Sequence, residues 1–227
     1  MRRAYIEAHV PLRRAVQTAL DWAAGNATIH VPDSSSVRDN EWIEGLGIPI
    51  TSSSSKSRLH GPPRGIVIGF CLNLSEVLEV ERSAGVGGIV VVQAHGPVRY
   101  AESAPSHAPW ITAFDVEHLG GEEIARIPEA SAPLKAAVNG LSGIAVVNQG
   151  LLDNRERSGA VQTLTYLRDH GVTLEPDGLM VEAMRNGWGG TGPEDLRKIA
   201  VDLNAGKALR FTKRITPERL EQWVQTK

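Results

Sequence analysis

The sequence predicts an α/β protein: a Rossmann-like, mostly parallel sheet of four or five strands, followed by a helical C-terminal region. Up to about residue 125, short apolar runs rich in β-branched residues alternate with helical patterns. Two of these runs, 66–70 and 89–92, are joined by a single amphipathic helix, as in a right-handed βαβ unit. Beyond about residue 150 helical periodicity replaces the strand signal.

The elements of the sheet follow in chain order. Residues 12–24 place apolar side chains at helical spacing, and Gly25 follows them as a natural stop. In the next helix Asn73 and Glu76 stand three residues apart as a capping pair. The runs expected to form strands are 28–31, 66–70, 89–92 and 110–114, with a short edge strand at 48–51.

The C-terminal part of the chain is expected to be helical. Helical spacing of apolar residues predicts helices at 154–170, 176–186, 193–204 and 217–224. We therefore expect a Rossmann-like region over residues 1–125 and a helical region over 151–227. Residues 126–150 form an ambiguous connection.

Composition limits the classes of function. The chain has 227 residues, of which 41% are apolar and 22% charged, as in soluble globular proteins. A net charge of -2 argues against a nucleic-acid binder that uses its whole surface. The single cysteine, Cys71, excludes an intramolecular disulfide and fits a reducing cytoplasm. No apolar run approaches the ~20 residues of a membrane span, so a soluble cytoplasmic protein without a membrane partner is expected.

Two glycine-rich segments match nucleotide-binding motifs only in part. Residues 187–192 fit G-x-G-x-x-G, but a helix rather than a strand precedes them. A connector between two helices is the favoured interpretation. Residues 201–208 lack the first glycine and the hydroxyl of a P-loop, since Val201 and Ala208 occupy those positions. The motifs therefore identify no cofactor.

Polar residues follow the expected strands, and ligands of open parallel sheets bind beyond the carboxyl ends of the strands. Asp33, His95 and Asp115 are the candidate catalytic residues, because carboxylates and an imidazole perform acid–base chemistry. The candidate ligand-binding residues are Ser34, Ser35, Asn73 and His118.

Each of these candidates has a structural alternative. Asp33 and Asn73 are also the N-caps that a strand-to-helix turn favours, and His95 also suits a turn. The spacing of Asp115, Glu117 and His118 matches no metal motif, so no metal site is predicted.

A basic segment lies near the C-terminal end. Lys207, Arg210, Lys213 and Arg214 surround Phe211, a combination that contacts phosphates and stacks on a base. Acidic neighbours dilute this charge, and a solvated loop is the alternative.

Three hypotheses of function follow. The first is a module that binds a small anionic, nucleotide-like ligand at the strand ends, without catalysis or as a regulator. The second is a hydrolase or transferase that uses Asp33, His95 and Asp115 in the same crevice. The third is a protein that binds nucleic acid or docks a partner through its helical tail.

Overall fold

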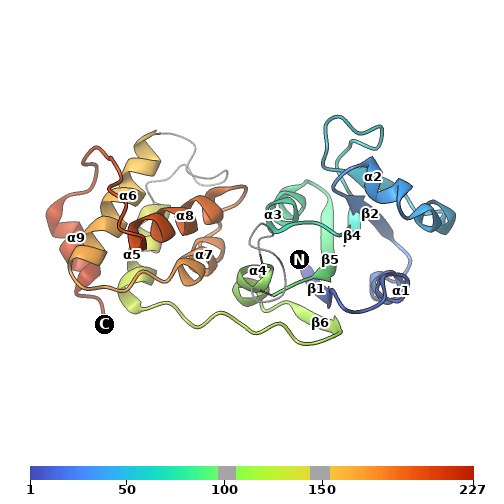
Figure 1. Cartoon of the computed structure of the whole chain (residues 1–227), viewed down its shortest axis with the longest axis horizontal. Coiled ribbons are helices and arrows are strands. Elements are labelled where there is room, and N and C mark those ends of the chain that lie inside the picture. Colours follow the sequence, from blue (N-terminus) through green and yellow to red (C-terminus); the bar gives the residue numbers. More distant parts are fainter. Residues whose placement is uncertain (97–105, 144–153) are drawn as a thin grey trace. The chain divides into compact units, whose positions relative to one another are not determined.

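The computed structural model describes residues 1–96, 106–143 and 154–227 (Figure 1). The chain divides into two compact units, Met1–Arg126 and Ile127–Lys227. The first unit is built on a sheet, whereas the described residues of the second form helices and loops only. An α/β fold with a helical C-terminal region was predicted from the sequence, and the structure confirms it.

The described residues of the first unit form a six-stranded parallel sheet in the order β3-β2-β4-β5-β1-β6. The inner strands β4 and β5 are nearly continuous apolar runs because helices cover both of their faces. All the strands run in one direction, so they end at a single edge, here called the carboxyl edge. The strands are β1 (Arg2–Glu7), β2 (Ala27–Val31), β3 (Ile50–Ser52), β4 (Gly65–Phe70), β5 (Val86–Ala94) and β6 (Glu117–Gly120).

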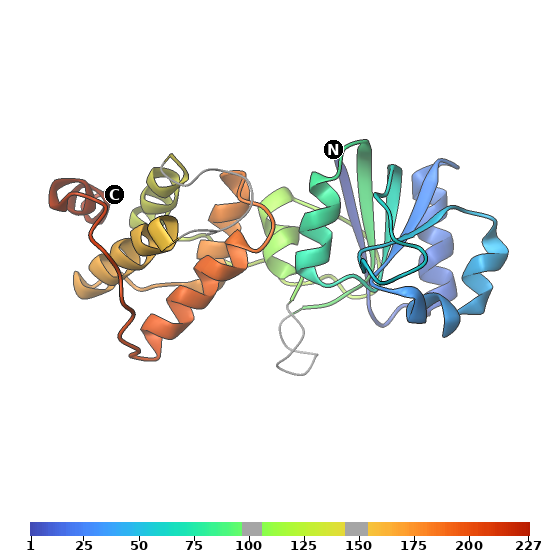
Figure 2. The ribbon, with the colours of Figure 1, turned by 90° about the horizontal axis from the view of Figure 1, so that it is seen from above.

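Helices cover the two faces of this sheet (Figures 1 and 2). One face packs against α1 (Leu12–Ala23), α2 (Ser34–Arg38) and the 3-10 helix η1 (Glu41–Leu46). Ile6, Val16 and Phe70 belong to the core between them. The opposite face carries α3 (Leu74–Arg82) and α4 (Ala108–Phe114). Burial of each large aliphatic side chain stabilises the fold by roughly 1.5–3 kcal/mol.

The strand assignment from sequence was wrong at one position and incomplete at two. Residues 110–114 form part of α4 rather than a strand, with Pro109 in the first turn. A five-residue apolar run does not distinguish a buried strand from a buried helix. The strands β1 and β6 were not predicted, so the sheet has six strands instead of four or five.

The second unit has a core of its own, formed by α5 (Ala132–Ser142), α6 (Asn154–Asp169), α7 (Pro176–Arg185), α8 (Gly192–Asn204) and α9 (Pro217–Val224). A Cβ at Gly140 would lie 2.2 Å from the Trp223 ring, so α5 and α9 pack closely there. The segment 187–192 joins α7 to α8, as predicted, with Gly192 as the first residue of α8, and the Trp188 indole N–H donates to the Ser142 hydroxyl at 2.7 Å. Among the described residues, no helix combines the length and the hydropathy needed to cross a membrane.

Candidate functional site

The topology marks two places at the carboxyl edge where a ligand is expected. After the adjacent strands β1 and β5, the chain continues to α1 on one face and to α4 on the other. After the adjacent strands β2 and β4, it continues to α2 and α3 in the same divergent way. Ligands of α/β sheets bind in the crevice at such points, because the two connections leave an opening between them.

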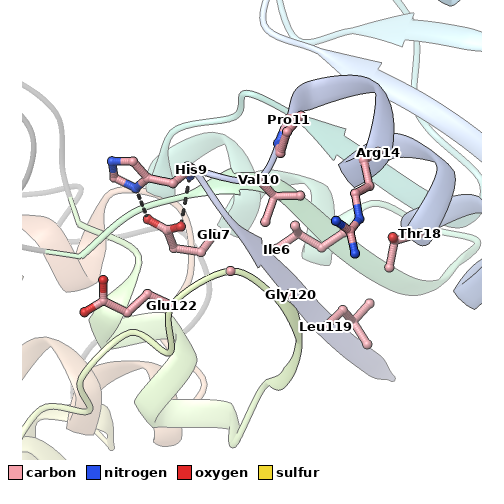
Figure 3. A pocket seen from close by; sticks show the side chains of 11 residues that line it. Ile6, Glu7, His9, Val10, Pro11, Arg14, Thr18, Leu119, Gly120 and Glu122 are labelled. Carbon is pink, nitrogen blue, oxygen red and sulfur yellow. Dashed lines mark hydrogen bonds and ion pairs between the residues drawn. The ribbon is translucent and has the colours of Figure 1, made fainter.

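A cavity of about 360 Å³ opens at the carboxyl edge, beside β1 and β6 (Figure 3). Its walls come from the end of β1, the first turns of α1 and the turn that follows β6. Small-molecule sites range from roughly 300 to 1,000 Å³, so a compact ligand fits here. The polar side chains that line it are Glu7, His9, Arg14, Thr18 and Glu122.

Glu7 and His9 form a hydrogen-bonded pair in the wall of this cavity. The Nδ1 atom of His9 lies 2.5 Å from Glu7 Oε1, and the His9 backbone N–H donates to Glu7 Oε2 at 2.9 Å. Burial by itself would raise the pKa of the Glu7 carboxyl, but hydrogen bonds from His9 and from the Glu122 amide outweigh it and lower that pKa. Glu7 is therefore ionised at neutral pH, and it fixes the orientation of the imidazole.

The turn after β6 closes against Glu7. Gly121 has a φ of +87°, and a Cβ at this position would lie 2.6 Å from Glu7 Cβ. Only glycine satisfies both the left-handed backbone and this close approach. The glycine therefore brings the Glu122 amide to the buried carboxylate.

Arg14 supplies positive charge to the same cavity. Within the described part of the chain, its guanidinium has no ion pair and no hydrogen bond to another residue. It lies in the first turn of α1, which has no side-chain cap and no acidic residue. The neighbouring Arg13 instead lies 5.4 Å above the Trp42 ring. In Figure 3 the apolar side chains of Val10 and Ile6 lie between His9 and Arg14.

Asp33 and Asn73 follow β2 and β4 at the carboxyl edge, where each is the N-cap of a helix. The Asp33 carboxylate accepts hydrogen bonds from the Ser35 hydroxyl and from the backbone N–H groups of Ser35 and Ser36, and these bonds lower its pKa. Ser34 and Ser35 lie in the first turn of α2. Asn73 and Glu76 form the predicted capping box of α3. The capping alternative accounts for the hydrogen bonds of both residues.

His95 follows β5 and contacts a histidine that the sequence did not single out. The His95 backbone N–H donates to His107 Nδ1 at 3.3 Å, and the two rings meet edge to face at 4.7 Å. The Nε2–H of His107 donates to the Leu72 carbonyl at 3.0 Å. Burial, with His95 nearby, lowers the pKa of His107 to about 4, so this ring is neutral at pH 7.

Asp115 does not join Asp33 and His95 at the carboxyl edge. It follows helix α4 and precedes β6, so it lies at the opposite edge of the parallel sheet, where its exposed side chain pairs with Arg126 at 2.6 Å. His118 lies within β6, stacked on Tyr5 with ring centroids 4.9 Å apart. The expectation that these residues converge depended on a strand at 110–114 and is therefore wrong.

Glu7, His9 and Arg14 were not among the predicted site residues, because strand β1 was not predicted from the sequence. The available signal was the apolar run Ala4–Ile6, which is followed at once by a carboxylate, an imidazole and a helix that begins after a proline.

No group of three or more metal-ligating side chains occurs in the described ranges. Cys71 is exposed at the surface, while the surrounding protein partly desolvates its thiol and raises the pKa to about 11.

The basic segment lies between α8 and α9 in the second unit. Lys207 pairs with Asp202 at 2.6 Å, whereas Arg210, Lys213 and Arg214 are exposed. Phe211 is 37% exposed. The backbone N–H groups of Arg214 and Ile215 donate to Gln162 Oε1, so α6 fixes the end of the segment.

Residues 133–224 match a family described as a domain of unknown function, DUF1889. The likeness is confined to the helical unit. The comparisons with curated proteins and with solved structures found no match. The assignment of a function to the sheet unit therefore depends on the geometry of its cavity.

Proposed function

We propose that the sheet unit binds a small anionic, nucleotide-like ligand in the cavity beside β1 and β6. The observation that carries this proposal is Arg14, which lines the cavity and has no ion pair within the described residues. A guanidinium binds a phosphate or carboxylate through two parallel N–H···O bonds, so an anion is its natural partner.

The surroundings of Arg14 favour the same ligand charge. The first turn of α1 directs its backbone N–H groups away from the helix, and this turn itself carries no acidic residue. The negative charge of Glu7 is already engaged by His9 and by the Glu122 amide. The anionic group therefore belongs at the Arg14 end, and the half-buried apolar side chain of Val10 contacts the rest of the ligand.

A thermal-shift screen tests the proposal. The panel contains inorganic phosphate, mononucleotides, dinucleotides and sugar phosphates, and it is applied to the wild type, Arg14→Gln and Arg13→Gln. A ligand at about 100 times its Kd stabilises the protein by about 2.7 kcal/mol. We expect Arg14→Gln to weaken binding about 10- to 100-fold, the loss of a charged hydrogen-bonding partner. Arg13→Gln is the control, since Arg13 contacts Trp42 instead.

Two results would contradict the proposal. The first is a wild type that no member of the panel stabilises. The second is an Arg14→Gln variant that binds as tightly as Arg13→Gln.

A second candidate function is the binding of single-stranded nucleic acid by residues 207–214. The observation that favours it is Phe211, an exposed aromatic ring among exposed cations. Phosphate contacts are salt-dependent, so we expect an oligonucleotide to dissociate as salt rises from 50 to 200 mM. Replacing Arg210 and Lys213 by glutamine should abolish this binding, whereas Arg197→Gln, at a residue paired with Asp177, should not. Absent or salt-independent binding in a fluorescence-anisotropy titration would exclude this function.

A further inference from the structure

We propose that Thr18 and Arg14 together bind a phosphate group, so that the cavity beside β1 and β6 favours a phosphomonoester over a carboxylate or a phosphodiester. This inference rests on the proposed function, because Arg14 must first bind an anion. It adds a second binding residue and names the class of anion.

The two side chains lie on the same face of α1. Thr18 follows Arg14 by four residues, slightly more than one helical turn, and residues at this spacing are neighbours on the surface of a helix. Both line the cavity, and Figure 3 shows them beside each other at the α1 end of it. A single bound group therefore reaches both side chains.

The Thr18 hydroxyl has no hydrogen-bonding partner in the described part of the chain. A helical threonine often donates to the carbonyl four residues earlier, as the Thr112 hydroxyl does to the Ala108 carbonyl at 2.8 Å in α4. Thr18 is half-buried and makes no such bond. Its hydroxyl is therefore free to donate to a ligand, as the Arg14 guanidinium is.

The number of donors determines the class of anion. The guanidinium of Arg14 offers two parallel N–H groups, and a planar carboxylate presents both of its oxygens to them. A tetrahedral phosphomonoester has a third terminal oxygen outside this plane, and the Thr18 hydroxyl is the donor for that oxygen. A phosphodiester has only two terminal oxygens, so it gains less from the third donor.

The surroundings of this pair also favour a bound phosphate. Val10 and Leu119 are half-buried apolar side chains of the same cavity, and apolar surroundings strengthen hydrogen bonds to an anion. The two carboxylates of the lining, Glu7 and Glu122, lie away from Arg14 in Figure 3. Neither of them therefore takes the place of the ligand on the guanidinium.

The test compares three ligands that share a phenyl group, namely phenyl phosphate, methyl phenyl phosphate and benzoate. Isothermal titration calorimetry gives the Kd of each ligand for the full-length chain. We expect the wild type to bind phenyl phosphate most tightly, a comparison that needs no variant. Valine has the shape of threonine without the hydroxyl. Thr18→Val should therefore weaken the binding of phenyl phosphate about 10- to 100-fold, the loss of a hydrogen bond to a charged group, and leave the binding of benzoate unchanged.

Two further variants distinguish the hydroxyl from the rest of the helix. Thr18→Ser keeps the hydroxyl and should bind phenyl phosphate as the wild type does. Gln17→Ala is the control, since Gln17 lies outside the lining of the cavity and donates to Asp21 at 2.9 Å. It should leave the Kd of all three ligands unchanged.

The outcomes separate this inference from the binding proposal. If Arg14→Gln weakens the binding of the screened ligands but Thr18→Val binds phenyl phosphate like the wild type, the role of Thr18 is wrong and the anion site stands. Benzoate or methyl phenyl phosphate bound as tightly as phenyl phosphate would also overturn the inference, and so would a Thr18→Ser variant as weak as Thr18→Val. If the wild type binds neither these ligands nor any member of the thermal-shift panel, both proposals are wrong.

Discussion

His30 and His107 are buried imidazoles of the sheet unit, and both ring nitrogens of each are hydrogen-bonded. His30 contacts the Thr51 hydroxyl at 2.8 Å and the Ser53 hydroxyl at 2.9 Å, which joins β2 to β3 and the loop that follows. His107 joins the chain after β4 to the chain after β5. Burial lowers the pKa of both rings to about 4. Their neutral forms are therefore part of the folded structure.

This burial makes the stability of the sheet unit depend on pH. The folded pKa values of about 4 lie below the ordinary value of 6.5, so the unfolded chain binds more protons between these limits. The stability contribution is complete above pH 6.5 and is lost as pH falls to about 4, by up to about 3 kcal/mol for each ring. We expect faster hydrogen exchange of the β4 and β5 amides at pH 4.5 than at pH 7.5, after correction for intrinsic rates.

The variant His107→Gln tests this pH dependence, and His60→Gln is its control. Glutamine at position 107 keeps a donor and an acceptor but does not titrate, so the pH dependence of exchange should become weaker. His60 is exposed, and its replacement should leave that dependence as in the wild type. An unchanged pH dependence in His107→Gln would refute the assignment to this ring.

At the scale of elements, the sequence predicted those helices and strands that are marked by residues within or directly beside them. The capping box at Asn73 and the N-cap at Asp33 each come from side chains within three residues of the helix start, and both are present in the structure. Strand β1 is different. It pairs with β5 and β6, more than 80 residues further along the chain, and its apolar run is only three residues long, after Arg2 and Arg3. Such a strand is defined by its partners more than by its own sequence.

The same difference between local and distant signals decided which residues of the candidate site could be predicted from the sequence. Asp33, Asn73 and His95 were placed at the carboxyl edge because the strands before them were recognised. Glu7, His9 and Arg14 lie at the end of β1 and just after it, and since this strand was not predicted, the cavity was not predicted either. Asp115 was misplaced because a helix was taken for a strand, which moved it from one edge of the sheet to the other.

At the scale of the whole molecule, the two units have separate cores. The core that contains Ile6 and Phe70 belongs entirely to the sheet unit, and the core that contains Leu164 and Trp223 belongs entirely to the helical unit. The likeness to DUF1889 also lies within the helical unit. The cavity beside β1 and β6 draws all of its lining residues from the sheet unit.

These separate cores predict that each unit folds when it is produced alone. Residues 1–131 contain all six strands and the full lining of the cavity, so this fragment should give an α/β circular-dichroism spectrum and the same ligand-induced thermal shift as the whole chain. Residues 127–227 should give a helical spectrum and no such shift.

A shorter fragment, residues 1–116, is the matched control, because it lacks β6 and the turn at Gly121 that closes on Glu7. Without that wall the cavity is open on the β6 side. The ligand-induced thermal shift should therefore disappear, even if the circular-dichroism spectrum shows that the rest of the sheet has folded. A fragment 1–131 that folds but does not bind the ligand of the whole chain would show that the binding site needs residues of the helical unit.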